Sequence, residues 1–195
     1  MTRYFHVYLQ KNKQMNIIDI VKNGGTILYP TDTVWGIGGD ATNPEVVEKI
    51  YRIKKRKPEK SMLILVDGYQ MLQEYVDEIP LEIWEILEKS IKPTTIIYDN
   101  PKNLPANLLA PDGSIGIRVV KRGFAKDLIK ATAKPLISTS ANITGEPTPK
   151  KFDEISPLIL QRVDYIVNLH RQTPGEKTSR IIKWTKEKGI EIIRP

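Results

Sequence analysis

The chain has 195 residues, of which 40% are hydrophobic, so one domain spanning residues 1–195 can bury a full-sized core. Thirty Lys and Arg against 23 Asp and Glu give a net charge of +7. That charge favours anionic partners, either phosphorylated small molecules or nucleic acid, although in many proteins it serves solubility alone. The sequence contains no cysteine, which excludes disulfides, zinc–thiolate sites, iron–sulfur clusters and cysteine nucleophiles.

The two histidines, His6 and His170, lie far apart and have no ligand-type neighbours at metal-binding spacing, so we expect structural or surface roles for them. The segment Met1–His6 carries a charge where a signal peptide needs an apolar run, and the apolar runs elsewhere are only strand-sized. We therefore expect a cytoplasmic protein with no membrane partner.

Helix-like and strand-like patterns alternate along the chain without an internal repeat. Residues 16–22 predict a helix that stops at two glycines, residues 26–29 a strand, and residues 44–52 a helix with Asn43 as its cap and Pro44 at its first position. Further helices are predicted at 69–76, 81–89 and 124–131, and further strands at 62–66, 94–98, 115–120, 135–139, 165–168, 180–183 and 190–193. This alternation predicts an α/β fold, a single domain around a twisted mixed β-sheet with flanking helices, whose strand order the pattern does not determine.

Three segments interrupt the pattern with residues that a core does not need. In the first, Tyr29–Ala41, a buried strand runs into threonines, Asp32 and several glycines, which suits either a ligand approaching the backbone or a tight turn. Gly36-Ile37-Gly38 lacks the third glycine and the helix context of a dinucleotide fingerprint, so that interpretation fails.

The second segment, Ile53–Ser61, carries five cations between a helix and a strand. Arg56 with its bidentate fork, and Lys54 and Lys60 as point charges, could wrap a triphosphate. A solvated basic helix end is the alternative, which the helix dipole favours. No Walker A sequence occurs, so a nucleotide would bind outside the P-loop scheme.

The third segment, Ser138–Gly145, follows a predicted strand and so places Ser140 and Asn142 at a carboxyl end, where open α/β sheets build their sites. Ser140 lacks the Gly-x-Ser-x-Gly elbow of a hydrolase nucleophile, and a hydrogen-bonding role suits it better.

Together, Tyr29–Gly36, the Lys54-x-Arg56 pair, Gly116–Val119 and Ser140–Pro147 resemble motifs of the YrdC-like threonylcarbamoyl-AMP synthases. The resemblance runs in order from about Asn16 to Pro195. It implies the short, single-domain form of the family, with no C-terminal extension domain.

The resemblance also implies a reaction, in which L-threonine, bicarbonate or carbon dioxide, and ATP give L-threonylcarbamoyladenylate and pyrophosphate. The enzyme would thus be a nucleotidyltransferase, with Mg²⁺ arriving on ATP and held mainly by phosphate oxygens rather than by a protein metal site. A partner tRNA threonylcarbamoyl-transferase complex would then modify tRNAs that read codons beginning with A.

Carried over by position, the resemblance assigns roles to ten residues. Lys54, Arg56, Ser140 and Asn142 match the family's signature tetrad, which contacts the nucleotide phosphates and the carbamate intermediate, so these four are the expected catalytic residues. ATP binding is further expected of Lys60, Thr95 and Arg194. Threonine binding is expected of Thr33, Arg118 and Ser179, with Arg118 the natural partner of the substrate carboxylate.

The sequence departs from the family pattern in four places. Ser61 stands where a proline is expected, Leu65 where many members have a histidine near the threonine substrate, and Arg180 where a threonine commonly follows Ser179. The usual Trp-Pro-Gly-Pro-x-Thr turn is here residues 90–95. These departures concern the amino-acid pocket more than the phosphate site.

Two other functions fit the same residues. The first is a non-catalytic module that binds tRNA or double-stranded RNA directly, which the net charge allows, although the Lys54–Lys60 cluster has none of the aromatic residues on which bases would stack. The second is an unrelated carbamoyl- or adenylyl-transferring enzyme with the same pocket.

Overall fold

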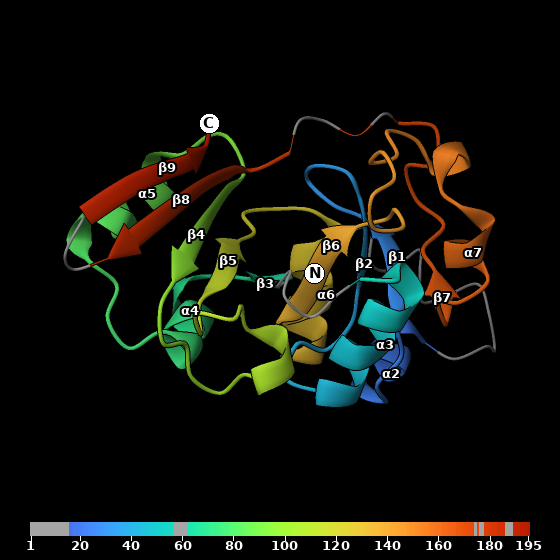
Figure 1. Ribbon diagram of the computed structural model, residues 1–195, viewed down its shortest axis with the longest axis horizontal. Coiled ribbons are helices and arrows are strands. Elements are labelled where there is room, and N and C mark those ends of the chain that lie inside the picture. Colours follow the sequence, from blue (N-terminus) through green and yellow to red (C-terminus); the bar gives the residue numbers. More distant parts are fainter. Residues whose placement is uncertain (1–15, 57–61, 174, 176–177, 186–188) are drawn as a thin grey trace.

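The computed structural model describes residues 16–56, 62–173, 175, 178–185 and 189–195, which form nine strands and six α-helices (Figure 1). The strands are β1 (Ile27–Pro30), β2 (Trp35–Gly38), β3 (Leu63–Val66), β4 (Thr94–Tyr98), β5 (Ile115–Val119), β6 (Leu136–Ser140), β7 (Tyr165–Ile166), β8 (Arg180–Thr185) and β9 (Gly189–Arg194). The helices are α2 (Ile17–Lys22), α3 (Pro44–Lys54), α4 (Tyr69–Tyr75), α5 (Leu81–Lys89), α6 (Phe124–Thr132) and α7 (Pro157–Leu160), with short 3₁₀ turns at Ala106–Leu108 and Phe152–Glu154. Within these ranges, no helix has both the length and the apolar character that a bilayer crossing requires.

The nine strands form one mixed sheet in the order β7-β1-β2-β6-β3-β5-β4-β8-β9. The pairs β1–β7, β3–β5 and β4–β8 are parallel, and the other neighbours are antiparallel. The prediction of an α/β fold around a mixed sheet is therefore confirmed. Between β7 and β8 the chain passes from one end of the sheet to the other, so the β8–β9 hairpin lies far from β7 (Figure 1).

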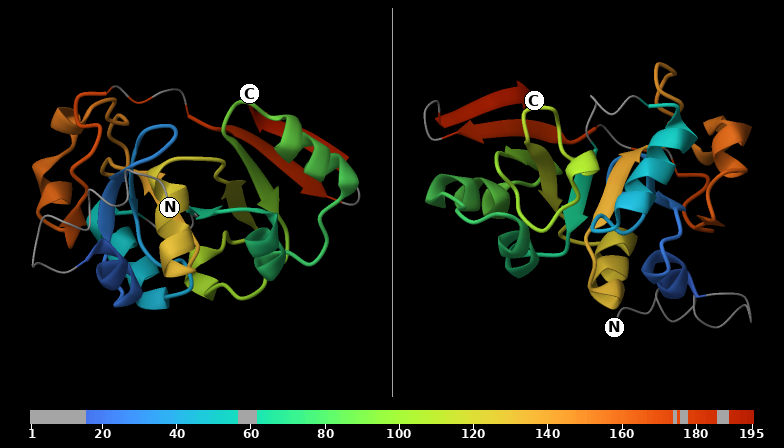
Figure 2. Two further views of the ribbon diagram at one scale, coloured as in Figure 1. Left: turned by 180° about the vertical axis from the view of Figure 1, so that it is seen from behind. Right: turned by 60° about the horizontal axis from the view of Figure 1, so that its bottom comes forward.

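Around β1, β3 and β6 the sheet is buried on both faces, because side chains that alternate along these strands enter two separate cores. In β1, Leu28 belongs to a core that includes residues of α3, α4, α5 and α7, whereas Ile27 and Tyr29 belong to a second core with α2 and α6. Helices α2 and α6 lie side by side over that second face (Figure 2).

Helix α3 confirms the predicted start but runs two residues further than predicted. The Asn43 side chain accepts a hydrogen bond from the Glu45 amide, and Pro44 follows it in the first turn. The helix ends at Lys54, after which Lys55 adopts a left-handed conformation with φ of 49°. Lys54 therefore belongs to the last helical turn rather than to the loop that follows.

Strand β2 and helix α7 were not predicted. Two glycines in Trp35-Gly36-Ile37-Gly38 weaken strand propensity, so the segment was interpreted as a turn or ligand loop. In the folded chain they permit close approach instead. A Cβ at Gly38 would overlap the Ile137 carbonyl oxygen and lie 2.9 Å from the Tyr29 ring. Helix α7 has only four residues, too few to show a helical period.

We predict that Gly38→Ala lowers the free energy of unfolding by at least about 2 kcal/mol, because the new methyl group must displace backbone in the sheet. Gly68→Ala is the matched control, since nothing lies within 4 Å of a Cβ at that position, and it should change stability by less than about 1 kcal/mol. Urea unfolding of the two variants measures this, and equal losses would contradict the packing argument.

Candidate functional site

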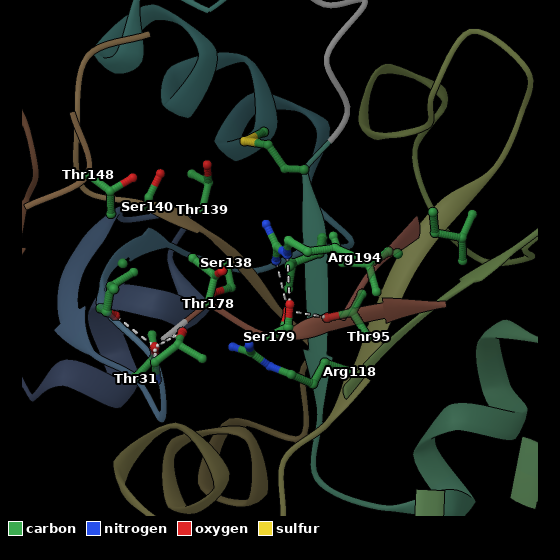
Figure 3. Close-up of a pocket in the computed structure, with 18 of the residues that line it drawn as sticks. Thr31, Thr95, Arg118, Ser138, Thr139, Ser140, Thr148, Thr178, Ser179 and Arg194 are labelled. Carbon is green, nitrogen blue, oxygen red and sulfur yellow. Dashed lines mark hydrogen bonds between the residues drawn. The ribbon is translucent and has the colours of Figure 1, made fainter. Parts of the chain in front are cut away.

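A cavity of about 330 Å³ lies where β2, β4, β5, β6, β8 and β9 contribute side chains to one space (Figure 3). Seven of the ten predicted site residues line it: Thr33, Arg56, Thr95, Arg118, Ser140, Ser179 and Arg194. Among the described residues, those that line it include three arginines and ten threonines and serines but no carboxylate. Such a wall suits an anionic ligand.

The sheet register brings Arg118 and Arg194 to this cavity. Arg118 of β5 pairs with Thr95 of β4, Thr95 pairs with Ile181 of β8, and Ile181 pairs with Arg194 of β9. Residues directly opposite one another share a face of the sheet, so this row runs across four strands on one side. Four segments that are remote in sequence are thereby aligned along one wall.

The two arginines are positive charges close to one another in a partly dry space. The Arg118 side chain is only 3% exposed. Burial, and then the neighbouring charge of Arg118, lower the pKa of Arg194 below its ordinary value. Burial likewise lowers the pKa of Arg56. Like charges this close together favour an anion that would neutralise them.

A chain of hydrogen bonds links the two predicted subsites. Thr95 Oγ1 and Ser179 Oγ lie 3.0 Å apart. The Arg194 guanidinium donates to the Ser179 carbonyl oxygen from Nε at 2.8 Å and to Ser179 Oγ from an Nη atom at 3.3 Å (Figure 3). Ser179 was assigned to threonine, and Thr95 and Arg194 to ATP, so a ligand of one subsite would contact groups that fix the other.

The turn between β1 and β2 forms the opposite wall. Thr31 Oγ1 donates to the Val34 carbonyl oxygen at 2.7 Å, accepts from the Thr33 amide at 3.0 Å, and lies 2.9 Å from Thr33 Oγ1. These bonds order the turn before any ligand binds. Thr33 is buried at 7% exposure and lines the cavity.

Lys54 and Asn142 do not line the cavity but hold the loop that does. Lys54 Nζ donates to the carbonyl oxygens of Ser140 and Asn142, the latter at 2.7 Å, and the Lys54 carbonyl oxygen accepts from the Thr144 amide at 2.9 Å. Ser140 Oγ donates to Asn142 Oδ1 at 2.5 Å, and Asn142 Nδ2 donates to the Glu146 carbonyl oxygen at 2.7 Å. The solvated helix end is therefore a wrong interpretation for Lys54, which is 1% exposed.

Burial, and next the charge of Arg56, lower the pKa of Lys54 to about 7. An amine that has lost its proton still has two N–H donors, which match the two carbonyl oxygens that it contacts. The clamp on the loop therefore does not require a charged lysine.

Lys60 and Ser61 lie outside the described residues. Leu65 and Arg180, two other positions at which the sequence departs from the family pattern, can be placed relative to the cavity. Leu65 pairs with Arg118 across β3 and β5 and is buried in the core that α2 and α6 cover. Arg180 pairs with Thr94 and does not line the cavity.

Six hydroxyl-bearing residues of the cavity were not assigned to the site from the sequence, although three of them lie within the predicted motifs. Thr31, Ser138 and Thr139 fall within segments that were singled out for polar residues, and their hydroxyl groups were the available signal. Ser114, Thr148 and Thr178 adjoin a predicted strand or motif but carried no signal of their own.

Comparison with known proteins places this architecture in a family. The model of the Sua5/YciO/YrdC family, described as "Telomere recombination", matches residues 19–195. The chain belongs to the Sua5/YciO/YrdC family.

Individual relatives agree with this assignment. The chain is 33% identical over 154 residues to a threonylcarbamoyl-AMP synthase of Pseudoalteromonas translucida, covering 77% of this chain and 82% of that protein. It is 31% identical over 191 residues to a putative threonylcarbamoyl-AMP synthase of Methanocaldococcus jannaschii, covering 94% and 88%. The crystal structure of P. abyssi Sua5 complexed with L-threonine superposes with a TM-score of 0.81 at 22% identity, over 92% of this chain. The aligned part is 52% of the Sua5 chain, so this chain spans about half the length of that relative.

We predict that Lys54 makes the free energy of unfolding rise with pH between about 7 and 10.5. Below pH 7 the buried ammonium carries its full burial cost. Above it the folded chain has released a proton that the unfolded chain still holds, so stability rises by at most about 1.4 kcal/mol per pH unit from this group. Lys54→Met keeps an apolar stem and removes the amine, which removes this rise.

Urea unfolding of both proteins at pH 7, 8 and 9 measures the effect. The difference between wild type and Lys54→Met should change with pH in favour of the wild type, and a flat difference would contradict the prediction. Lys22→Met makes the same chemical change at an exposed position of α2 and serves as the reference.

Proposed function

We propose that the chain is an L-threonylcarbamoyladenylate synthase, a nucleotidyltransferase that makes threonylcarbamoyl-AMP and pyrophosphate from L-threonine, bicarbonate or carbon dioxide, and ATP. Family membership and the two relatives named threonylcarbamoyl-AMP synthase support it. The observation that carries it is the cavity itself, in which three arginines and many hydroxyl groups converge without a lining carboxylate in the described part of the chain.

The two substrates use different residues of this wall. Arg118 holds the threonine carboxylate, and Thr33 and Ser179 orient the amino acid beside it. Arg56, Arg194, Thr95 and the Ser140 hydroxyl hold the nucleotide phosphates. The bound L-threonine named for P. abyssi Sua5, whose fold is the same, supports an amino-acid subsite in this architecture.

The reaction needs no protein nucleophile. The threonine amine attacks carbon dioxide with release of a proton to water, or bicarbonate with loss of water, and gives a carbamate. A carbamate oxygen then attacks the α-phosphorus of ATP, the bond to the β-phosphate oxygen breaks, and pyrophosphate leaves. Negative charge builds on phosphoryl oxygens in that step, so fixed cations and hydroxyl donors can supply the catalysis by positioning and charge stabilisation.

In this scheme Lys54 and Asn142 act on the reaction by holding the Ser140 loop in place, while Lys60, outside the described residues, remains a proposed phosphate contact. Mg²⁺ enters as part of the Mg–ATP substrate, bound mainly by phosphate oxygens and water. A site lined by hydroxyls and cations suits that form of the metal. The product would pass in the cytoplasm to a tRNA threonylcarbamoyl-transferase complex.

The burial of the arginines favours a small-molecule substrate over the RNA-binding module. A guanidinium that is 3% exposed at the wall of a 330 Å³ cavity can contact a small ligand within the cavity, but not the backbone of a folded RNA.

The proposal predicts that pyrophosphate release requires threonine, bicarbonate and Mg–ATP together. Incubation of the protein with ATP and labelled bicarbonate, with and without each amino acid, measures pyrophosphate, and mass spectrometry identifies the adenylate. Unchanged pyrophosphate release without threonine, together with no threonylcarbamoyladenylate, would show the proposal to be wrong.

Arg56→Ala should reduce turnover or nucleotide affinity by about 10- to 150-fold, because a charge-assisted contact to phosphate contributes roughly 1.5–3 kcal/mol. Arg56→Lys should restore part of this, since it keeps the charge but loses the planar fork. Arg52→Ala is the control, an exposed arginine of α3 shortly before Arg56, which follows the end of that helix. Its side chain is 71% exposed, so steady-state activity should change by less than about twofold. Equal losses in Arg56→Ala and Arg52→Ala would indicate a diffuse basic patch.

A further inference from the structure

The buried guanidinium of Arg118 depends on a single carboxylate. In the described part of the chain its one ion-pair partner is Asp32, whose Oδ1 lies 3.0 Å from an Nη atom of Arg118. The Nε atom of Arg118 is buried without a hydrogen-bond partner. Because a buried cation is costly unless it is paired, the position of this guanidinium rests on Asp32.

Asp32 reaches Arg118 from outside the substrate cavity. Arg118 lines the 330 Å³ cavity and Asp32 does not; Asp32 instead lines a neighbouring cavity of about 720 Å³. Thr31 and residues 33–35 line both spaces, so the turn between β1 and β2 is the wall that divides them. The Arg118 side chain points across the cavity toward the turn that carries Thr31 (Figure 3).

The turn is built to hold Asp32 in a fixed place. The Thr31 hydroxyl bonds to the Val34 carbonyl oxygen and to the Thr33 amide, and so closes the backbone around the intervening carboxylate. The Asp32 side chain is 27% exposed, less than a solvated surface carboxylate would be. Arg118, the ion-pair partner of Asp32, is fixed in β5 by the strand register with β3 and β4.

We propose that Asp32 is a positioning residue for the amino-acid subsite: from the turn that divides the two cavities it fixes one edge of the Arg118 guanidinium, so that another edge meets the substrate carboxylate. This inference rests on the proposed function and assigns Asp32 no contact with substrate. The carboxylate also places a negative charge 3.0 Å from Arg118, whose positive charge lowers the pKa of the neighbouring Arg194.

The test compares the wild type with three variants. The affinity of each protein for L-threonine and for ATP is measured separately by calorimetry. Asp32→Asn keeps the shape and removes the charge, and should weaken threonine binding by about 10- to 100-fold, since a misplaced binding group costs up to about that much. ATP affinity should change by less than about threefold. Asp32→Glu keeps the charge and should recover part of the threonine affinity. The matched control is Asp77→Asn, which removes the same charge from a surface ion pair with Lys102 and should leave both affinities unchanged.

A double-mutant cycle separates positioning from a general effect on folding. If Asp32 acts only through Arg118, Asp32→Asn has no further effect on threonine affinity in an Arg118→Gln background. The double variant has no unpaired buried charge, so it keeps the test open even where Asp32→Asn alone folds poorly. An additional loss in that background would overturn the proposal.

The remaining outcomes distinguish this inference from the function on which it rests. Wild-type protein that binds threonine, with Asp32→Asn binding it equally or more tightly, would overturn the positioning role and leave the proposed synthase standing. Equal losses of threonine and ATP affinity would do the same, since they would indicate a structural role alone. Wild-type protein that fails to bind threonine in the presence of ATP would overturn both.

Discussion

The contact on which the site geometry depends is the buried amine of Lys54. It joins the last turn of α3 to the loop after β6, two segments that are 86 residues apart in sequence at the Ser140 contact. Without this amine the Ser140 carbonyl oxygen would keep, among the described residues, only the Asn142 amide as a donor, and the Asn142 carbonyl oxygen would lose the bond to Lys54. Loss of a buried hydrogen bond costs roughly 1–3 kcal/mol. The same loop carries the Ser140 hydroxyl to the cavity. The Lys54 contact therefore fixes the position of a group that could donate a hydrogen bond to a phosphate.

The ends of the helix that carries this amine follow from local features, but the contacts of the amine do not. The Asn43 cap fixes where α3 begins, the Lys55 left-handed residue fixes where it ends, and helical periodicity then turns Lys54 inward with Ile50 and Ile53. A basic run predicts solvated charge, and for Arg52 and Lys55 that holds. Lys54 differs because its contacts come from a loop distant in sequence, which periodicity alone cannot reveal.

The regular elements could be predicted because their local patterns agree with their tertiary environment. Helix α5 and strand β4 have the predicted bounds, and most other elements differ from them by one or two residues. Strand β2 could not be predicted, because its glycines serve a close approach to β6 that exists only after folding. The site followed the same division. The family resemblance assigned Thr33, Arg56, Arg118 and Ser140 to the site, whereas strand register, which no local pattern encodes, aligned Thr95 with Arg118 and brought β9 beside β8.

The electrostatics of the site are local and do not follow from the net charge of +7. Exposed lysines and arginines are screened by water and salt over roughly 8–10 Å, whereas the arginines around the cavity are shielded from solvent and act on one another. Such a cluster is stable only if something offsets its repulsion. Asp32, in the dividing turn, places one negative charge beside Arg118, and the lining of the cavity itself offers no carboxylate among the described residues. The positive charge of the arginines is therefore not matched within the cavity, where an amino-acid carboxylate and a polyphosphate can neutralise it.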